Sequence, residues 1–199
     1  MTLPEPATLA DFGPMAERAV SADAEALIRF RGSAQSVAGF VRLPYDVLAG
    51  RTIATESRSF DLTLSVADFL RWQAEPERQP VRKDASWLAA LPPAAGWQRV
   101  ELVPDQAIRE VVRSGALLAR DATSRSGQQA LLGAIVLTAH SGTATVEVPL
   151  GPLSALTRMG FLPRGGQAAV DIAPGWIRIA AEYGSTYAAT GSPLNLLAL

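Results

Sequence analysis

A single histidine and the absence of cysteine restrict the chemistry available to this chain of 199 residues. Without cysteine the chain has no disulfide, no thiolate zinc site, no iron–sulfur cluster and no cysteine nucleophile. The lone imidazole, His140, directly precedes Ser141, and a serine adjacent in sequence usually has the wrong geometry for a catalytic triad. Its position at the end of an apolar run favours a structural histidine that meets the free carbonyls of a helix C-terminus.

The carboxylates and glycines show no pattern typical of a cofactor or metal site. Five acids lie on segments with a regular pattern: Asp61, Asp68, Glu101, Asp105 and Glu110. No two of them pair on one face of a predicted helix, and the chain lacks the Gly-x-Gly-x-x-Gly and Gly-x-x-x-x-Gly-Lys patterns that bind phosphates. We therefore expect no cofactor and no metal, and we favour a noncatalytic protein. The alternative is an enzyme or small-molecule binder that uses these carboxylates and Tyr45, Tyr183 or Tyr187.

Large aromatic and apolar side chains provide the candidate sites, because tryptophan and arginine are enriched among the residues that dominate interface energies. Trp176 alternates with Arg178 on one face of a predicted strand, and isoleucines occupy the other face. If the isoleucines face the core, Trp176 is exposed unless another part of the chain covers it. We expect a partner-binding surface that draws on these residues: Trp176, Arg178, Trp72, Trp97, Leu196 and Leu197.

The charge balance bears on the class of partner. The chain carries 18 basic and 19 acidic side chains, for a formal net charge of −1. Non-specific DNA binding needs an excess of positive charge to neutralise phosphates, so this balance argues against a broad nucleic-acid surface. No segment reaches the roughly 18 consecutive apolar residues of a membrane helix, and the first residues lack the pattern of a signal peptide. We expect a cytoplasmic protein that does not bind membranes and whose partner is a protein or a second copy of itself.

The apolar pattern divides the chain into an arm, two lobes, a linker and a tail. Prolines and glycine in residues 1–23 predict an N-terminal arm with at most a short helix, and residues 76–96 mix prolines with charges as a linker does. Residues 191–199 predict a Leu-rich C-terminal tail. The first lobe, residues 24–75, contains strand patterns at 26–31, 37–43 and 61–64 and a helix pattern at 66–74.

The second lobe, residues 97–190, alternates strand and helix patterns. They are a strand at 97–103, helices at 105–120 and 128–138, a strand at 143–148, a helix at 151–159 and a hairpin at 168–183. Three segments, at 41–48, 62–69 and 146–153, share a pattern in which a strand turns directly into a helix. The recurrence suggests that the lobes are related to each other.

These elements predict an α+β fold in which a mostly antiparallel sheet has helices packed on one face, with two related α/β lobes as a further hypothesis. We interpret the chain as a noncatalytic interaction or adapter protein that forms a homodimer through its apolar second half. A winged-helix DNA-binding regulator is the alternative, since helix 105–120, helix 151–159 and the hairpin are the parts that such a domain needs. The supposed recognition helix offers only Arg158, with Arg164 just beyond it, which weighs against that alternative.

Overall fold

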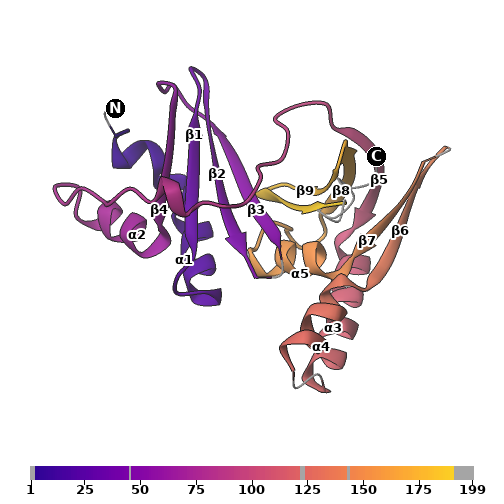
Figure 1. The fold of residues 1–199 in the computed structure, drawn as a ribbon. Helices are drawn as coiled ribbons and strands as arrows, with labels where there is room; N and C mark the ends of the chain where they lie inside the picture. The colour runs from indigo at the N-terminus through magenta and orange to yellow at the C-terminus, as the bar shows by residue number, and fades with distance from the viewer. Residues whose placement is uncertain (1–2, 45, 122–123, 143, 191–199) are drawn as a thin grey trace, which may run out of the picture. The chain divides into compact units, whose positions relative to one another are not determined.

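Two compact units make up the chain (Figure 1). The computed structural model describes residues 3–44, 46–121, 124–142 and 144–190. Unit 1 comprises residues 1–44 and 48–90, and unit 2 comprises residues 45–47 and 91–199. Both units combine helices with antiparallel strands, so the predicted α+β class is confirmed. The boundary at residues 90 and 91 lies within 76–96, the segment interpreted as a linker.

Unit 1 contains a four-stranded arrangement in the order β4-β1-β2-β3, in which β1 pairs antiparallel with both β2 and β4. Its elements are η1 (Pro6–Phe12), α1 (Gly13–Ala22), β1 (Leu27–Gly32), β2 (Ser36–Leu43), β3 (Val47–Ala54), β4 (Phe60–Ser65), α2 (Val66–Ala74) and η2 (Asp84–Ser86). The apolar pattern does not predict β3, because Gly50 and Arg51 interrupt it. The segment 41–48, expected to turn into a helix, instead leads from β2 into β3.

Phe30 stands at the centre of the core of unit 1. It is fully buried on β1, and the ring centroids of Phe12 and Phe69 lie 5.2 and 5.0 Å from its own. Phe12 comes from η1 and Phe69 from α2, so both helical segments pack on the same face of the strands. Gly39 of β2 permits this approach, because a Cβ atom there would lie 2.6 Å from the Phe12 ring. Helices therefore cover one face of the strands in unit 1, as predicted.

The N-terminal residues belong to this core, which corrects the expectation of an arm over residues 1–23. Leu9 and Phe12 of η1 and Met15 of α1 are buried. Prolines occur in the first turn of both helices, where the missing N–H costs no helix hydrogen bond. The prolines that suggested irregular structure thus begin helices instead.

Part of the segment interpreted as a linker runs along the outer edge of β4. Lys83 donates its backbone N–H to the carbonyl of Thr63 at 2.7 Å, and Thr63 donates its own N–H to Asp84 Oδ1 at 2.8 Å. Nη2 of Arg82 donates to the carbonyl of Asp61 at 2.8 Å, and the Trp87 side chain is buried. These contacts satisfy the backbone groups of an edge strand that would otherwise offer them to another chain.

Unit 2 contains strands in the order β10-β9-β8-β5 and a separate two-stranded sheet of β6 and β7. Its elements are β5 (Gln98–Pro104), α3 (Asp105–Asp121), α4 (Arg125–Gly133), β6 (Ile135–Ser141), β7 (Ala144–Pro149), α5 (Leu150–Arg158), β8 (Gln167–Ala173), β9 (Trp176–Ala181) and β10 (Gly184–Ala189). The hairpin of β8 and β9 turns at Pro174 and Gly175, as predicted, and Gly175 adopts the left-handed conformation with φ 75°. The strand β10 is not predicted, since its small and polar residues give a weak apolar pattern.

The sequence predicted one helix over residues 128–138, and this prediction is wrong. The helix α4 ends at Gly133, and the β-branched residues that follow enter β6, which pairs with β7. His140 consequently lies in β6 and not at a helix C-terminus, so the expected contact with free helix carbonyls is wrong. Its backbone N–H donates to Oε2 of Glu101 at 2.9 Å.

Each unit contains a strand that passes directly into a helix, which confirms two of the three predicted junctions. In unit 1, β4 continues into α2, and the Ser65 hydroxyl caps the helix by accepting from the N–H of Asp68 at 3.0 Å. In unit 2, β7 continues into α5 at Leu150. The two lobes are related in this respect.

Asp105 at the start of α3 is expected to make unit 2 sensitive to acid. The backbone N–H of Gly165 donates to its carboxylate and lowers its pKa below the ordinary value of 3.8, and Arg109 adds to this effect. Such a carboxylate stabilises the fold above its unfolded-state pKa, and the contribution is lost as the pH falls through the folded-state pKa. We expect urea unfolding at a series of pH values to show a smaller loss of stability below about pH 4 for Asp105→Asn than for the wild type.

The control is Asp11→Asn, which removes the same charge from an exposed position in η1. Its stability should follow the wild-type curve. Parallel curves for Asp105→Asn and the wild type would contradict the assignment.

Candidate partner-binding surface

Four side chains form a row across unit 2, one from each strand of its larger sheet. Asp171 of β8 lies opposite both Arg99 of β5 and Arg178 of β9. Arg178 in turn lies opposite Tyr187 of β10. Directly opposed residues of antiparallel strands point to the same face, so the four share one face of the sheet, and the neighbouring Ile177 and Ile179 are buried on the other. We call these four residues the arginine row.

Two guanidinium groups donate hydrogen bonds to the carboxylate of Asp171. Nε and Nη2 of Arg178 lie 3.0 and 2.7 Å from Oδ2, and Nε of Arg99 lies 3.3 Å from Oδ1. The Asp171 side chain is 2% exposed, that of Arg178 is 24% exposed, and that of Arg99 is 59% exposed. A buried carboxylate needs such partners, because an unpaired charge away from water is costly. The three groups together carry one net positive charge, which Arg99 presents to solvent.

Trp97 covers the middle of the arginine row. Its ring centroid lies 4.4 Å from Cζ of Arg178, within the range of a cation–π contact, and 5.9 Å from the ring centroid of Tyr187. Its Nε1 donates to the carbonyl of Pro93 at 2.9 Å, which holds the indole in place. Burial raises the pKa of the Tyr187 phenol, so this side chain is uncharged at neutral pH.

This arrangement suits recognition better than catalysis. Together with Trp97, the row holds guanidinium, phenol and indole groups around one ion-paired carboxylate, and this group contains no nucleophile beside a general base. Tryptophan, tyrosine and arginine side chains that are already held in place concentrate binding energy in protein interfaces. The exposed guanidinium of Arg99 can donate to a carboxylate or a carbonyl of a partner. Across the described ranges, no group of three or more metal-ligating side chains could hold a metal ion.

The structure brings together two of the residues expected from the sequence, Trp97 and Arg178. Trp176 is half-buried at the start of β9, on the same face as Arg178, and lies opposite Ala173 and Ala189. Trp72 is only 3% exposed within unit 1, so its place on a partner surface is corrected: it belongs to the core. Leu196 and Leu197 lie outside the described residues.

Sequence reasoning missed Arg99 and Asp171, and it named Tyr187 only for the enzyme or small-molecule alternative. One feature of the sequence pointed to Asp171: it interrupts the apolar residues of a predicted strand, and an acid in such a position is either exposed or paired. Arg178 lies only seven positions from Asp171, directly opposite it in the predicted hairpin. Arg99 could not be identified as the second partner, because it lies 72 positions away along the chain and the β5 register contains an irregularity between Arg99 and Glu101.

Four large aliphatic side chains in the described part of unit 2 are exposed to solvent. They lie on β5, α3 and β6 and are Leu102, Leu117, Leu118 and Ile135. Exposed apolar side chains are common singly, but groups of them mark interaction surfaces. Their occurrence agrees with the apolar character of the second half of the sequence.

The helix expected to read DNA in the winged-helix alternative does not present a free surface. Leu150, Leu153 and Leu156 of α5 are buried, and the Pro152 carbonyl accepts from the buried Thr186 hydroxyl at 2.9 Å. The helix packs against α3, α4 and the strands β9 and β10. Because a recognition helix must enter a DNA groove, this packing contradicts the winged-helix alternative.

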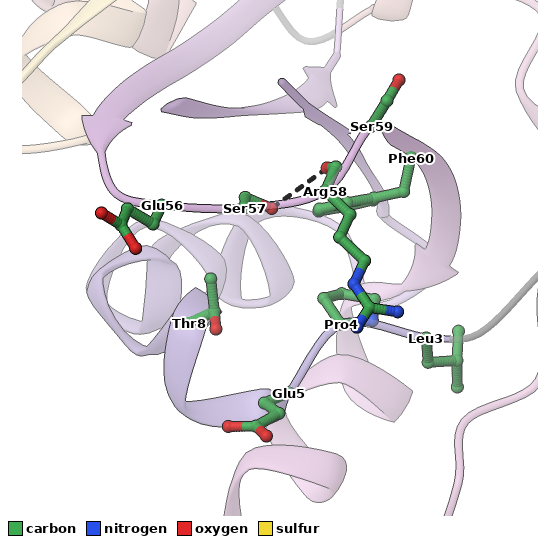
Figure 2. Close-up of a pocket in the computed structure, with 9 residues that line it drawn as sticks. All are labelled: Leu3, Pro4, Glu5, Thr8, Glu56, Ser57, Arg58, Ser59 and Phe60. Carbon is green, nitrogen blue, oxygen red and sulfur yellow. Dashed lines mark hydrogen bonds between the residues drawn. The ribbon is translucent and has the colours of Figure 1, made fainter. Parts of the chain in front are cut away.

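Unit 1 holds a cavity of about 400 Å³ between its N-terminal segment and the loop from β3 to β4 (Figure 2). Glu5, Glu56 and Arg58 line it, together with apolar and hydroxyl side chains. None of these residues was a candidate from the sequence, because the two segments lie about fifty positions apart. The cavity is separate from the arginine row, which belongs to unit 2.

Two family models together span most of the chain. Residues 92–193 match Domain of unknown function (DUF8185), and residues 1–91 match Domain of unknown function (DUF8010). The two matches meet at residues 91 and 92, next to the boundary between the units. No curated protein sequence matches the chain. Within the described residues, no helix has the length and apolar character needed to cross a membrane.

Solved structures of sliding clamps share the fold. The β subunit of DNA polymerase from Streptococcus pyogenes matches with a TM-score of 0.60 and 13% identity, over 91% of this chain and 63% of the clamp chain. The DNA polymerase sliding clamp of Bacillus subtilis matches with a TM-score of 0.59 and 11% identity, over 94% of this chain and 64% of the clamp chain. The pol III β of Caulobacter crescentus matches with the same TM-score and identity, over 92% and 64%. The chain thus spans slightly less than two thirds of the length of these clamps, and the likeness concerns the fold.

Proposed function

The chain belongs to the family described as Domain of unknown function (DUF8185), and on this premise we propose that it is a noncatalytic, clamp-like protein of the cytoplasm that acts by binding protein partners, including a second copy of itself. The main support is the fold match, which extends over more than nine tenths of the chain. The matched proteins are named as sliding clamps and subunits of DNA polymerase. A fold that serves as a subunit of a larger assembly supports a role in assembly.

The arginine row supplies the surface for this role. The row and the Trp97 ring over it combine tryptophan, tyrosine and arginine, residue types that dominate interface energies, with the exposed guanidinium of Arg99. Trp176 extends the same face to the start of β9. The exposed leucines of α3 and β5 increase the apolar area that unit 2 offers to a partner.

Self-association can be tested by light scattering over a wide range of protein concentrations. We expect a species with twice the mass of one chain. We expect Trp176→Ala to raise its dissociation constant at least about fivefold, because truncation of a tryptophan that dominates an interface costs more than about 1 kcal/mol. The matched control is Leu88→Ala, which truncates a side chain that is 86% exposed in unit 1. It should leave the dissociation constant unchanged.

Two outcomes would contradict parts of this proposal. A monomer at every concentration contradicts self-association, and a dimer that Trp176→Ala leaves intact places the contact away from the face of the arginine row. Fluorescence anisotropy with a labelled DNA duplex tests the nucleic-acid alternative. Binding that weakens steeply with salt would favour a DNA partner, since release of counterions from the phosphates produces that dependence.

A further inference from the structure

The cavity of unit 1 is lined by charges that have no partner in the protein. Within the described ranges, the Arg58 guanidinium and the carboxylates of Glu5 and Glu56 make no hydrogen bond or ion pair. In Figure 2 the Arg58 side chain extends toward Pro4 and Leu3, whereas both carboxylates lie on the other side of the view. Opposite charges therefore line one cavity without neutralising each other.

The rest of the lining separates into apolar and hydroxyl groups. Leu3, Pro4 and the largely buried Phe60 supply an apolar wall, and Thr8, Ser57 and Ser59 supply hydroxyls. A volume of about 400 Å³ lies within the range of small-molecule sites, which pair an apolar wall with a few polar groups that fix orientation.

Packing holds the loop that carries Arg58 in place. Gly32 of β1 lies opposite Phe60 of β4, and a Cβ atom at Gly32 would lie 2.2 Å from the Phe60 ring and 2.6 Å from the Arg58 carbonyl oxygen. Glycine at this position is what allows the ring and the loop to approach β1 so closely. The Ser57 hydroxyl donates to the same carbonyl at 3.2 Å.

The charges select the chemical class of the ligand. A purely anionic ligand would meet two carboxylates, and a purely cationic one would meet the Arg58 guanidinium, so either would be partly repelled. A zwitterion satisfies charges of both signs, because its carboxylate can accept from Arg58 while its ammonium donates to Glu5 or Glu56. We propose that this cavity binds a small zwitterion of the amino-acid class, an amino acid or short peptide with a free ammonium, a free carboxylate and an apolar side chain. This inference goes beyond the proposed function and concerns the other unit.

The test titrates the full chain with two probes, leucine and the tripeptide Gly-Leu-Gly, and follows backbone amides by NMR. We expect at least one probe to shift the amides of Thr8, Ser57 and Ser59 with a dissociation constant below about 1 mM. Which of the two binds more tightly identifies the source of the zwitterion. N-acetylated and C-amidated forms of the tighter probe each lack one charge and should bind at least about tenfold more weakly, since charge-assisted hydrogen bonds are the strong ones.

Variants connect each end of the ligand to its partner. Arg58→Gln should weaken binding of the unmodified probe about tenfold and should remove the difference between the free and the amidated forms. The double variant Glu5→Gln, Glu56→Gln should remove the difference between the free and the acetylated forms. Arg58, Glu5 and Glu56 are exposed and unpaired, so these changes leave the fold intact. Arg78→Gln is the control, because Arg78 is exposed, lies outside the cavity and approaches Glu75 only to 3.9 Å.

The results that would overturn the proposal are distinct. They are the absence of shifts with both probes at millimolar concentration, equal binding of the free and capped forms, and unchanged binding by Arg58→Gln. Because none of these measurements involves the arginine row or the mass of the assembly, failure here leaves the proposed function standing, and the reverse is also true.

Discussion

Replacing Asp171 with alanine is expected to lower the free energy of unfolding by about 3 kcal/mol, because removal of one member of a buried ion pair leaves the other charge uncompensated. Arg178, with three quarters of its side chain buried, loses the acceptor of two hydrogen bonds. Arg99 is exposed enough to recover its hydration. Urea unfolding followed by circular dichroism measures the effect.

Asp61→Ala is the matched control for this variant. Asp61 also accepts two hydrogen bonds from one guanidinium, that of Arg29, at 2.8 and 2.7 Å, but its side chain is 43% exposed. Arg29 is 27% exposed, much like Arg178, so the two pairs differ mainly in the burial of the carboxylate. Because water reaches the Asp61 carboxylate, its pairing contributes less, and we expect a smaller loss. Equal losses for the two variants would show that burial of Asp171 is not what makes its pairing important.

Asp171→Ala also tests the proposed partner surface. Without Asp171 the two arginines repel each other, and neither retains its orientation in the row. We expect Asp171→Ala to weaken self-association as Trp176→Ala does, at a temperature where circular dichroism shows that the protein is still folded. Unchanged association would mean that the partner does not contact the arginine row.

Phe30→Ala is expected to destabilise unit 1 by about 4 kcal/mol, in the range that truncation of a fully buried phenylalanine costs. The ring lies between Phe12 and Phe69, so its removal leaves a cavity that both helical segments border. The β1 backbone is paired on both sides and cannot move inward to fill it. Urea unfolding gives the total loss, and amide hydrogen exchange in β1, β2 and β4 should show that it is concentrated in unit 1.

Leu88→Ala serves as the control for the removal of apolar volume, because Leu88 is exposed. Its effect should stay within about 0.5 kcal/mol. A loss below about 2 kcal/mol for Phe30→Ala would show that the two helical segments close over the cavity, and the central place of Phe30 in the core would then be wrong.

Much of the secondary structure could be predicted from local sequence. The alternation of Ile177 and Ile179 predicts a strand with one buried face, and both side chains are buried on β9. Ser65 followed by an acid three positions later predicts the start of α2, and the expected cap is present. Pro174 and Gly175 likewise predict the turn between β8 and β9, and the structure has the turn there. These features depend on residues within a few positions of one another.

Long-range packing decided the sites. The arginine row joins residues from four strands, and the unit 1 cavity joins residues 3–8 with residues 56–60. Such neighbours follow from strand register and from the close approach that Gly32 and Gly39 allow, and neither can be read from the residues around them. Burial of Trp72 and the helical N-terminus are likewise tertiary outcomes. The sequence by itself determined which side chains the chain can use and where many of its helices and strands begin, and the tertiary structure decided which side chains meet, because that depends on contacts between segments far apart in the chain.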